Sequence, residues 1–309
     1  VAVRVLVLPW VWFSSRAQDV AECAVEDGHS LLQLPPENTP QPRSSHEGPV
    51  RPIGFAKVHK TGGTTFAFIA LGIASRRGMR VMFPADNHRL GWPGSFPGAK
   101  NGRAVGEPVH QYELILHHAV FNATAYQAYL KPNPYFVSVL REPTSQAASA
   151  RNYFGDMNTG HATSWQEHLA WLKALQAPDQ GHVPVDKARG RFLNPQAWDL
   201  GWYEYVGFTA AHDRDDAMVR RWLAHLEKSF TFPAGLIWMT EHFEEGLVLL
   251  GEDLGIDVQE LQYVPINHRG SAKVSLTEAE SQELAGLYSV DRALQAHFNA
   301  TFWRRWSRG

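Results

Sequence analysis

The sequence predicts an α/β fold in which a mostly parallel β-sheet is covered on both faces by helices. Short, continuous apolar runs that suit buried strands alternate along the chain with segments of helical periodicity. The first apolar run ends in a glycine-containing turn, and a helical pattern follows it directly, as in a strand–loop–helix unit. With 309 residues, of which 44% are hydrophobic, the chain can bury the core that such a sheet requires.

The charges of the chain nearly cancel, with 29 Lys and Arg residues against 31 Asp and Glu residues. This balance gives no sign of a protein that coats nucleic acid, so we expect no nucleic-acid partner and only a local anion site. The single cysteine, Cys23, excludes an intramolecular disulfide framework and a cysteine-rich zinc site.

The first 52 residues differ in composition from the rest of the chain. Residues 1–23 start with an almost wholly apolar stretch and predict a signal peptide or the remnant of a membrane anchor, with a buried first strand as the alternative. Residues 24–52 are rich in proline among polar residues and predict a stem or linker. The globular domain is therefore predicted over 53–309. It contains two N-x-T sequons, at Asn122 and Asn299, which are compatible with a lumenal chain.

The elements of this domain can be placed in order. Residues 53–58 predict the first strand, and the helix after it ends with two arginines followed by Gly78, as helix C-termini prefer. Residues 84–108, rich in Gly and Pro, predict a long surface loop that includes Trp92 and Phe96. Further strands are predicted at 112–118, 135–140 and 235–240, and helices from Pro143, at 165–176, at 216–230 and around 244–255.

The segment KTGGTTF, at 60–66, predicts an anion-binding loop between the first strand and the first helix. Gly62 and Gly63 let backbone N–H groups approach an anion, and the helix that follows points the positive end of its dipole there. The other candidate donors are the charge of Lys60 and the hydroxyls of Thr61, Thr64 and Thr65. The lysine precedes the glycines, so the ATP-type loop G-x-x-x-x-G-K-[ST] does not fit. An ordinary Gly/Thr turn with a solvated lysine is the alternative.

A second candidate anion site follows the strand at 135–140. Arg141 stands at its carboxyl end, the edge at which open α/β sheets bind ligands. On the helix after it, Ser145, Ser149 and Tyr153 recur every four residues and share a face. An arginine fork and a serine hydroxyl suit a separate phosphate group. A surface arginine beside a serine-rich helix is the alternative.

Together the two segments resemble the sulfotransferase superfamily, in which such motifs bind the 5'-phosphosulfate and the 3'-phosphate of 3'-phosphoadenosine 5'-phosphosulfate (PAPS). Arg141 and Ser149 stand at the matching eight-residue interval. The resemblance narrows to the Golgi galactose 3-O-sulfotransferases, the group that includes galactosylceramide sulfotransferase, and it covers about residues 53–270 in islands. The segments that carry it are HKTGGTTF, LILHHAVFN, VSVLREPTSQAASARNYFG, RFLNPQAWDLG, IWMTEHFEEGLVLL and YVPINHRG.

The resemblance implies a P-loop-like three-layer sandwich, with PAPS as donor and 3',5'-diphosphoadenosine (PAP) as product. It implies transfer of a sulfuryl group to the 3-OH of a galactose on a glycolipid or glycoprotein, in the Golgi lumen, by a type II membrane protein, with no metal required. The sequence departs from the family pattern at residues 84–110, at Glu142, where Asp or His is usual, and at Trp198, where Phe is more familiar. These departures bear on the acceptor more than on the chemistry.

The resemblance also implies roles for individual residues. Lys60 would neutralise charge on the leaving group, and a histidine would take the proton of the acceptor hydroxyl. We favour His118 as this base, with His117 as its support or an acceptor contact and His59 as a third candidate; a packed or solvated side chain is the alternative for each. The acceptor cleft is expected to include Asn194, Gln196, Trp198 and Asp199, for which a capping segment around a core tryptophan is the alternative. Arg269 and Lys273 are expected to close over the 3'-phosphate, unless they belong to an exposed basic loop.

Three other functions remain open at this stage. A uronyl or hexosamine O-sulfotransferase acting on glycosaminoglycan would need a broad basic groove, which the balanced charge disfavours. An ATP-dependent phosphotransferase would prefer ATP with magnesium to PAP. A non-catalytic protein of the same fold would bind glycans without turnover. The oligomeric state is not indicated by the sequence.

Overall fold

The structure is a computed structural model that describes residues 50–84, 89–97, 111–158, 164–176, 183–263 and 276–308. The predicted hydrophobic segment 1–23, nearly all of the predicted stem 24–52, and both Arg269 and Lys273 lie outside the described residues. Among the residues described, no helix combines the length and the apolar character needed to cross a membrane.

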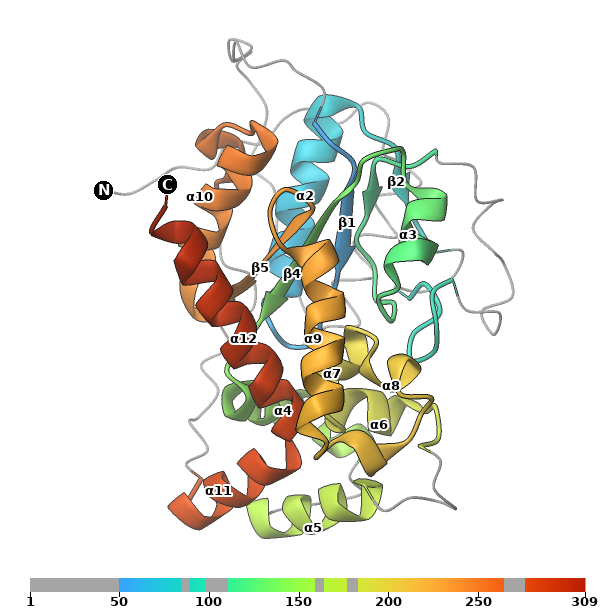
Figure 1. The fold of residues 1–309 in the computed structure, drawn as a ribbon, viewed down its shortest axis with the longest axis vertical. Coiled ribbons are helices and arrows are strands. Elements are labelled where there is room, and N and C mark those ends of the chain that lie inside the picture. Colours follow the sequence, from blue (N-terminus) through green and yellow to red (C-terminus); the bar gives the residue numbers. More distant parts are fainter. Residues whose placement is uncertain are drawn as a thin grey trace.

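A five-stranded parallel sheet forms the centre of the molecule, which confirms the predicted fold class (Figure 1). Its strands stand in the order β2-β3-β1-β4-β5, and β1 pairs with both β3 and β4. Ile53 of β1 lies opposite Leu114 of β3 and Tyr135 of β4. The strands are β1 (Ile53–Ala56), β2 (Val81–Met82), β3 (Leu114–Ile115), β4 (Tyr135–Leu140) and β5 (Gly235–Met239).

Helices cover both faces of the sheet, and alternate side chains of the strands point to each layer. Along β4, Tyr135, Val137 and Val139 face one core cluster, whereas Phe136 and Leu140 face the other. The first cluster is covered by α2 (Gly63–Arg77) and α10 (Phe243–Leu254), and the second by α3 (Ala123–Tyr129), α9 (Asp216–Phe230) and α12 (Ser289–Trp306). The result is the three-layer sandwich that the sequence predicts.

A second group of helices lies beyond the carboxyl ends of the strands, in the lower half of Figure 1. It consists of α4 (Pro143–Asn158), α5 (Trp165–Gln176), α6 (Lys187–Phe192), α7 (Pro195–Asp199), α8 (Trp202–Tyr205) and α11 (Glu278–Leu287). Three 3-10 turns complete the described elements: η2 (Ala210–His212), η3 (Thr240–His242) and η4 (Val258–Leu261). The helical group has its own apolar cluster, which includes Phe154, Trp165, Leu169 and Phe192.

Two predicted elements need correction. The strand predicted over 112–118 pairs as a strand only at Leu114–Ile115, with isolated bridges at Tyr112 and His118. The segment 84–108 was predicted as a surface loop, but part of it is buried. Within its described residues, Trp92 and Phe96 are only 2% and 4% exposed. The glycines and prolines bend the backbone, but large aromatic side chains within such a segment still gain most by burial.

The strand order makes the carboxyl edge of β1 and β4 the expected ligand-binding end of the sheet. From β1 the chain continues to β2 and β3 on one side, then crosses to β4 and β5 on the other. Open parallel sheets bind ligands outside the carboxyl ends of the strands where the order reverses in this way. The loops after β1 and β4 carry the two predicted anion sites.

Candidate functional site

The loop after β1 is held in shape by hydrogen bonds to its neighbours. The hydroxyl of Thr61 donates to the carbonyl oxygen of Val58 at 3.1 Å. The Thr240 hydroxyl lies 2.7 Å from the carbonyl oxygen of Thr61 and 2.9 Å from that of Leu140. One side chain after β5 therefore links the loop after β1 to the end of β4.

The loop ends at the N-terminus of α2, as the sequence predicts. Gly62 is the N-cap, with a left-handed φ of 83°, and the first turn contains no acidic residue. This positive φ favours glycine here, because other residues adopt it only with strain. A 15-residue helix thus presents its first N–H groups at the carboxyl edge of the sheet.

Lys60 lies at the bend of this loop and reaches toward α4. Its backbone is also left-handed, with φ 61°. Its ammonium nitrogen lies 3.7 Å from the centroid of the Tyr153 ring, a cation–π contact. Tyr153 is the last residue of the predicted Ser145–Ser149–Tyr153 face, so this face of α4 runs toward Lys60. Ser149, one turn before Tyr153, is partly buried.

Arg141 directly follows β4 and lies beside the same loop. One guanidinium nitrogen is 3.4 Å from the carbonyl oxygen of Lys60. Its backbone is fixed by Gln196, whose side-chain oxygen accepts the Arg141 N–H and whose amide nitrogen donates to the Arg141 carbonyl, both at 2.9 Å. The structure therefore brings Lys60 and Arg141, the charged residues of the two predicted anion sites, into one place.

The start of α4 is capped by the residue after Arg141. The carboxylate of Glu142 accepts the backbone N–H groups of Thr144 at 2.8 Å and Ser145 at 2.7 Å. Acidic residues commonly cap helix N-termini in this way. Glu142, one of the positions at which the sequence departs from the family pattern, thus caps the helix that carries Ser149 and Tyr153.

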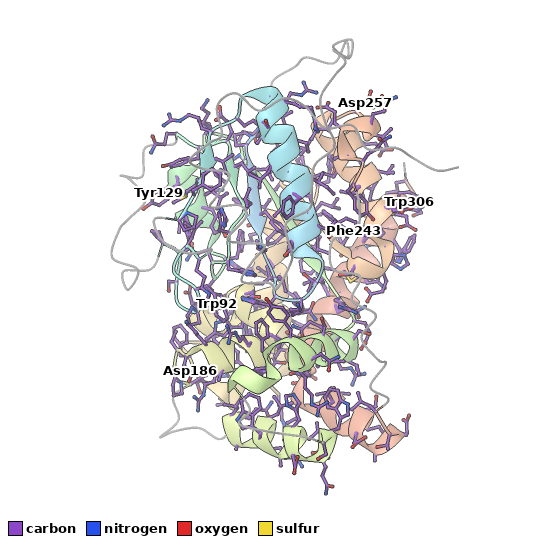
Figure 2. All side chains as sticks on the ribbon, turned by 180° about the vertical axis from the view of Figure 1, so that it is seen from behind. Trp92, Tyr129, Asp186, Phe243, Asp257 and Trp306 are labelled. Carbon is purple, nitrogen blue, oxygen red and sulfur yellow. The ribbon has the colours of Figure 1, made fainter. Side chains whose placement is uncertain are left out.

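Two of the three candidate bases stack on each other next to Lys60. The rings of His59 and His118 have centroids 3.9 Å apart and an interplanar angle of 20°. The Nδ1 atom of His59 lies 2.8 Å from a carboxylate oxygen of Asp199, and Nδ1 of His118 lies 3.2 Å from the carbonyl oxygen of Lys57. The Trp92 ring packs against His59 at 4.3 Å. Figure 2 shows Trp92 at the level where the sheet-bearing half meets the helices beneath it.

His117 lies in different surroundings from His118, as expected for neighbours on an extended chain. Its ring is 5% exposed and packs near Phe83, with centroids 5.6 Å apart. His117 therefore does not join the His59–His118 stack.

The residues expected at the acceptor cleft gather at the short helix α7 but are at most 1% exposed. The Asn194 oxygen accepts the backbone N–H groups of Val290 and Asp291 at 3.2 and 3.3 Å, which caps the start of α12. The Trp198 ring N–H donates to the Pro93 carbonyl at 3.0 Å. Their polar atoms are thus engaged with protein groups, as are those of Gln196 and Asp199.

Asp291, on α12, is a residue of this region that sequence reasoning missed. Its two carboxylate oxygens accept the N–H groups of Gln196 at 3.2 Å and Ala197 at 2.7 Å. Burial raises the pKa of Asp291 to about 8. A single aspartate almost a hundred residues from its partners leaves no pattern in the sequence, and the helix that carries it was not predicted.

Within the described residues, no group of three or more His, Cys, Asp or Glu side chains is placed to hold a metal ion. Among the described residues, Lys60, Arg141 and the N-terminus of α2 offer positive charge to an anion at this edge. Such a donor set suits a phosphate or sulfate ester.

Comparison with known proteins agrees with the resemblance seen in the motifs. A model of the family described as galactose-3-O-sulfotransferase matches residues 1–308. Galactose-3-O-sulfotransferase 3 of Mus musculus is 28% identical over 281 residues, which are 90% of this chain and 61% of that protein. Galactose-3-O-sulfotransferase 2 of Sus scrofa is 28% identical over 260 residues, covering 83% and 62%, respectively. Galactosylceramide sulfotransferase of Bos taurus is 27% identical over 259 residues, covering 83% and 58%.

The chain spans about three fifths of the length of the curated relatives that it matches. The family match, in contrast, extends over nearly the whole chain and includes the loops after β1 and β4 and the histidine stack. The protein belongs to the galactose-3-O-sulfotransferase family.

Proposed function

We propose that this protein transfers the sulfuryl group of PAPS to a sugar hydroxyl, and that the acceptor is the 3-OH of a galactose on a glycolipid or glycoprotein. The observation that carries the proposal is the contact between the Lys60 and Arg141 loops at the switch point of the sheet, with the His59–His118 stack beside them. The family match supports it, as do relatives whose names specify galactose or galactosylceramide.

The donor is bound through its two charged ends. The N-terminus of α2 and Lys60 bind the 5'-phosphosulfate, together with the loop residues Thr61, Gly62, Gly63, Thr64 and Thr65. Thr61 is fully buried and its hydroxyl donates to Val58, so the role of this hydroxyl is to shape the loop. Arg141 and Ser149 bind the 3'-phosphate, and Arg269 and Lys273 assist there.

When bound, PAPS supplies the sulfuryl group and leaves as PAP. Lys60 neutralises charge on the bridging oxygen as its bond to sulfur breaks, and Tyr153 holds the ammonium group at the edge of the sheet. His118 takes the proton of the acceptor hydroxyl while the sugar oxygen bonds to sulfur. The carbonyl of Lys57 can only accept a hydrogen bond, so Nδ1 of His118 carries hydrogen and Nε2 is the basic nitrogen. His117 supports the segment after β3 from the face opposite His118.

We place this activity in the Golgi lumen, with residues 1–23 as the signal or anchor segment. We propose that the acceptor cleft lies beside α7. The buried residues of this region support it, because Gln196 holds Arg141 in place and Trp198 and Asn194 fix the short helix.

A transfer assay tests the proposal directly. The protein is incubated with radiolabelled PAPS and a panel of galactosides, galactolipids and glycosaminoglycans. We expect donor-dependent label on galactose-terminated acceptors, and periodate resistance of the labelled galactose identifies the 3-position. Folded protein that labels none of the acceptors would refute the enzyme proposal. Label confined to glycosaminoglycans would assign the other sulfotransferase class, and turnover of ATP with magnesium would assign a phosphotransferase.

A further inference from the structure

The buried carboxylate of Asp199 receives three N–H donors around the histidine stack. One oxygen lies 2.7 Å from the backbone nitrogen of His59 and 2.8 Å from its Nδ1 atom. The other oxygen accepts the ring N–H of Trp92 at 2.7 Å. Asp199 is 1% exposed, so these bonds are shielded from water.

This arrangement fixes both the position and the tautomer of His59. An ionised carboxylate can only accept hydrogen bonds, so the hydrogen of the neutral His59 ring resides on Nδ1 and the lone pair on Nε2. The bond to the backbone N–H holds the residue directly before Lys60. Trp92 is itself held in place by close packing against Gly190. The contact is so tight that a Cβ atom on Gly190 would lie only 2.7 Å from the Trp92 ring.

The ring of His59 is in turn the surface on which His118 lies. The two rings are nearly parallel at 3.9 Å, and the backbone of Lys57, two residues before His59, accepts from His118. Asp199 stands on α7, the same short helix whose Gln196 fixes the backbone of Arg141. A shift of Asp199 would therefore be transmitted to the stack.

We propose that Asp199 is a positioning residue for sulfuryl transfer, which locks His59 and through it orients His118. The inference rests on the proposed function, and it gives Asp199 a task other than contact with the acceptor. Trp92 supports the same arrangement, because its ring N–H donates to the second carboxylate oxygen of Asp199 and its ring packs on His59. The arrangement resembles in its physics the carboxylate of a catalytic triad, which orients an imidazole without exchanging a proton itself.

The chain offers a matched control in Asp213. It is also a buried aspartate of the helical half, and it accepts the ring N–H of Trp202 and the hydroxyl of Tyr203, each at 2.8 Å. Its hydrogen bonds hold α8 and Asn194 instead of an imidazole. Asp213→Asn therefore reports what the loss of a buried charge costs the fold, and Asp199→Asn reports in addition what the loss of the His59 contact costs the reaction.

The test compares Asp199→Asn, Trp92→Phe and Asp213→Asn with the unmodified chain. We expect Asp199→Asn to lower kcat by roughly 10- to 100-fold, less than the loss of a general base, while PAP binding stays unchanged. Trp92→Phe keeps the ring on His59 but loses one donor, and should show a smaller fall in kcat. Imidazole ¹⁵N spectra should show the Nδ1–H tautomer of His59 in the unmodified protein and in Asp213→Asn, and its loss in Asp199→Asn.

Two results would overturn the inference. One is a folded Asp199→Asn protein with unchanged kcat, and the other is a loss of activity with the His59 tautomer intact. If Asp199→Asn does not fold, the Trp92→Phe spectrum decides, because an unperturbed His59 signal with reduced kcat contradicts the linkage. Absence of transfer by the unmodified chain would instead refute the proposed function, and the tautomer measurement would still stand on its own.

Discussion

At the scale of single residues, Lys60 combines an unusual backbone with the key charge of the site. A non-glycine residue at φ 61° carries strain of order 1 kcal/mol, and such strain gathers at functional sites. The strained bend lets the side chain leave the strand and reach the Tyr153 ring, at the edge where β1 and β4 end. The left-handed backbone of Lys60 therefore determines where its charge lies.

We predict that Lys60→Ala and Arg141→Ala fail in different ways. Lys60→Ala should lower kcat by roughly 10²- to 10³-fold, as the loss of a charge-stabilising donor does. Arg141→Ala should mainly raise the KM for PAPS, by about 10-fold or more, because it removes a charged hydrogen-bonding group from the ground state as well. Steady-state kinetics with varied donor measure both.

The control for this pair is Lys131→Ala. Lys131 forms an ion pair with Glu113, which precedes β3 at the opposite edge of the sheet, and its side chain is 45% exposed. Its removal should leave both constants near those of the unmodified protein. An unchanged kcat in Lys60→Ala would show that Lys60 does not stabilise charge in the reaction.

We also predict that His118 matters more to turnover than His117. His118→Ala should lower kcat by roughly 10²- to 10⁴-fold, the usual contribution of a general base. His117 is buried away from the stack near Phe83, so His117→Ala should retain a larger share of the activity and lose stability instead. Kinetics and thermal unfolding of both variants decide the order, and a greater loss of kcat in His117→Ala would reverse the assignment.

At the scale of elements, helices with one clear apolar face were predictable, whereas the short helices and the 18-residue α12 were not. The helices predicted at 165–176 and 216–230 coincide with α5 and α9, because each contains three or more turns with one apolar face. The helices α6, α7 and α8 have six, five and four residues, which is too few for a period to show. Left-handed residues at Asn194 and Gly201 start two of them, and only the glycine is a recognisable signal.

The packing of α5 leads to a prediction about pH. His168 is fully buried among Trp165, Trp171 and Phe192, and burial, with the charge of Arg151 adding to it, lowers its pKa from 6.5 to about 4. The folded protein therefore keeps this ring neutral at a pH where the unfolded chain protonates it. The stability that it contributes is complete above pH 6.5 and is lost as the pH falls toward 4, by up to about 3 kcal/mol.

Replacement of His168 should remove that part of the pH dependence. The free energy of unfolding of His168→Gln, measured in denaturant from pH 7 to pH 4, should fall less steeply than that of the unmodified protein. The exposed His225 on α9 provides the control variant, His225→Gln, in which a surface histidine is replaced in the same way. Equal slopes for all three proteins would show that His168 does not titrate as its burial indicates.

At the scale of the whole molecule, the site is assembled from segments far apart in the chain. The sequence could predict that Lys60 and Arg141 lie near each other, because parallel strands deliver their carboxyl ends to one edge. It could not predict the bond between His59 and Asp199, which are 140 positions apart, or the support of α7 by Asp291. Those contacts depend on how the helical group docks onto the sheet, and side-chain pairing of this kind leaves no periodic signal.

The joint use of both anion sites gives a prediction for the molecule as a whole. If the loops after β1 and β4 bind one nucleotide between them, PAP stabilises the folded state against unfolding. At about 100 times its Kd, the gain is about 2.7 kcal/mol, which corresponds to a rise in Tm of roughly 5 °C for a domain of this size. AMP lacks the 3'-phosphate and should raise Tm less at the same concentration. Thermal scans of the unmodified protein with PAP, AMP and ATP with magnesium measure the three effects.

The variants show which site reads which phosphate. In Arg141→Ala the advantage of PAP over AMP should disappear, because the second phosphate has lost its arginine fork. In Lys60→Ala both nucleotides should stabilise less, by similar amounts, since each retains the 5'-phosphate that the α2 loop binds. An Arg141→Ala protein that still distinguishes PAP from AMP would place the 3'-phosphate elsewhere. A larger shift with ATP and magnesium than with PAP would mean that the two loops, though joined in the fold, hold a different nucleotide.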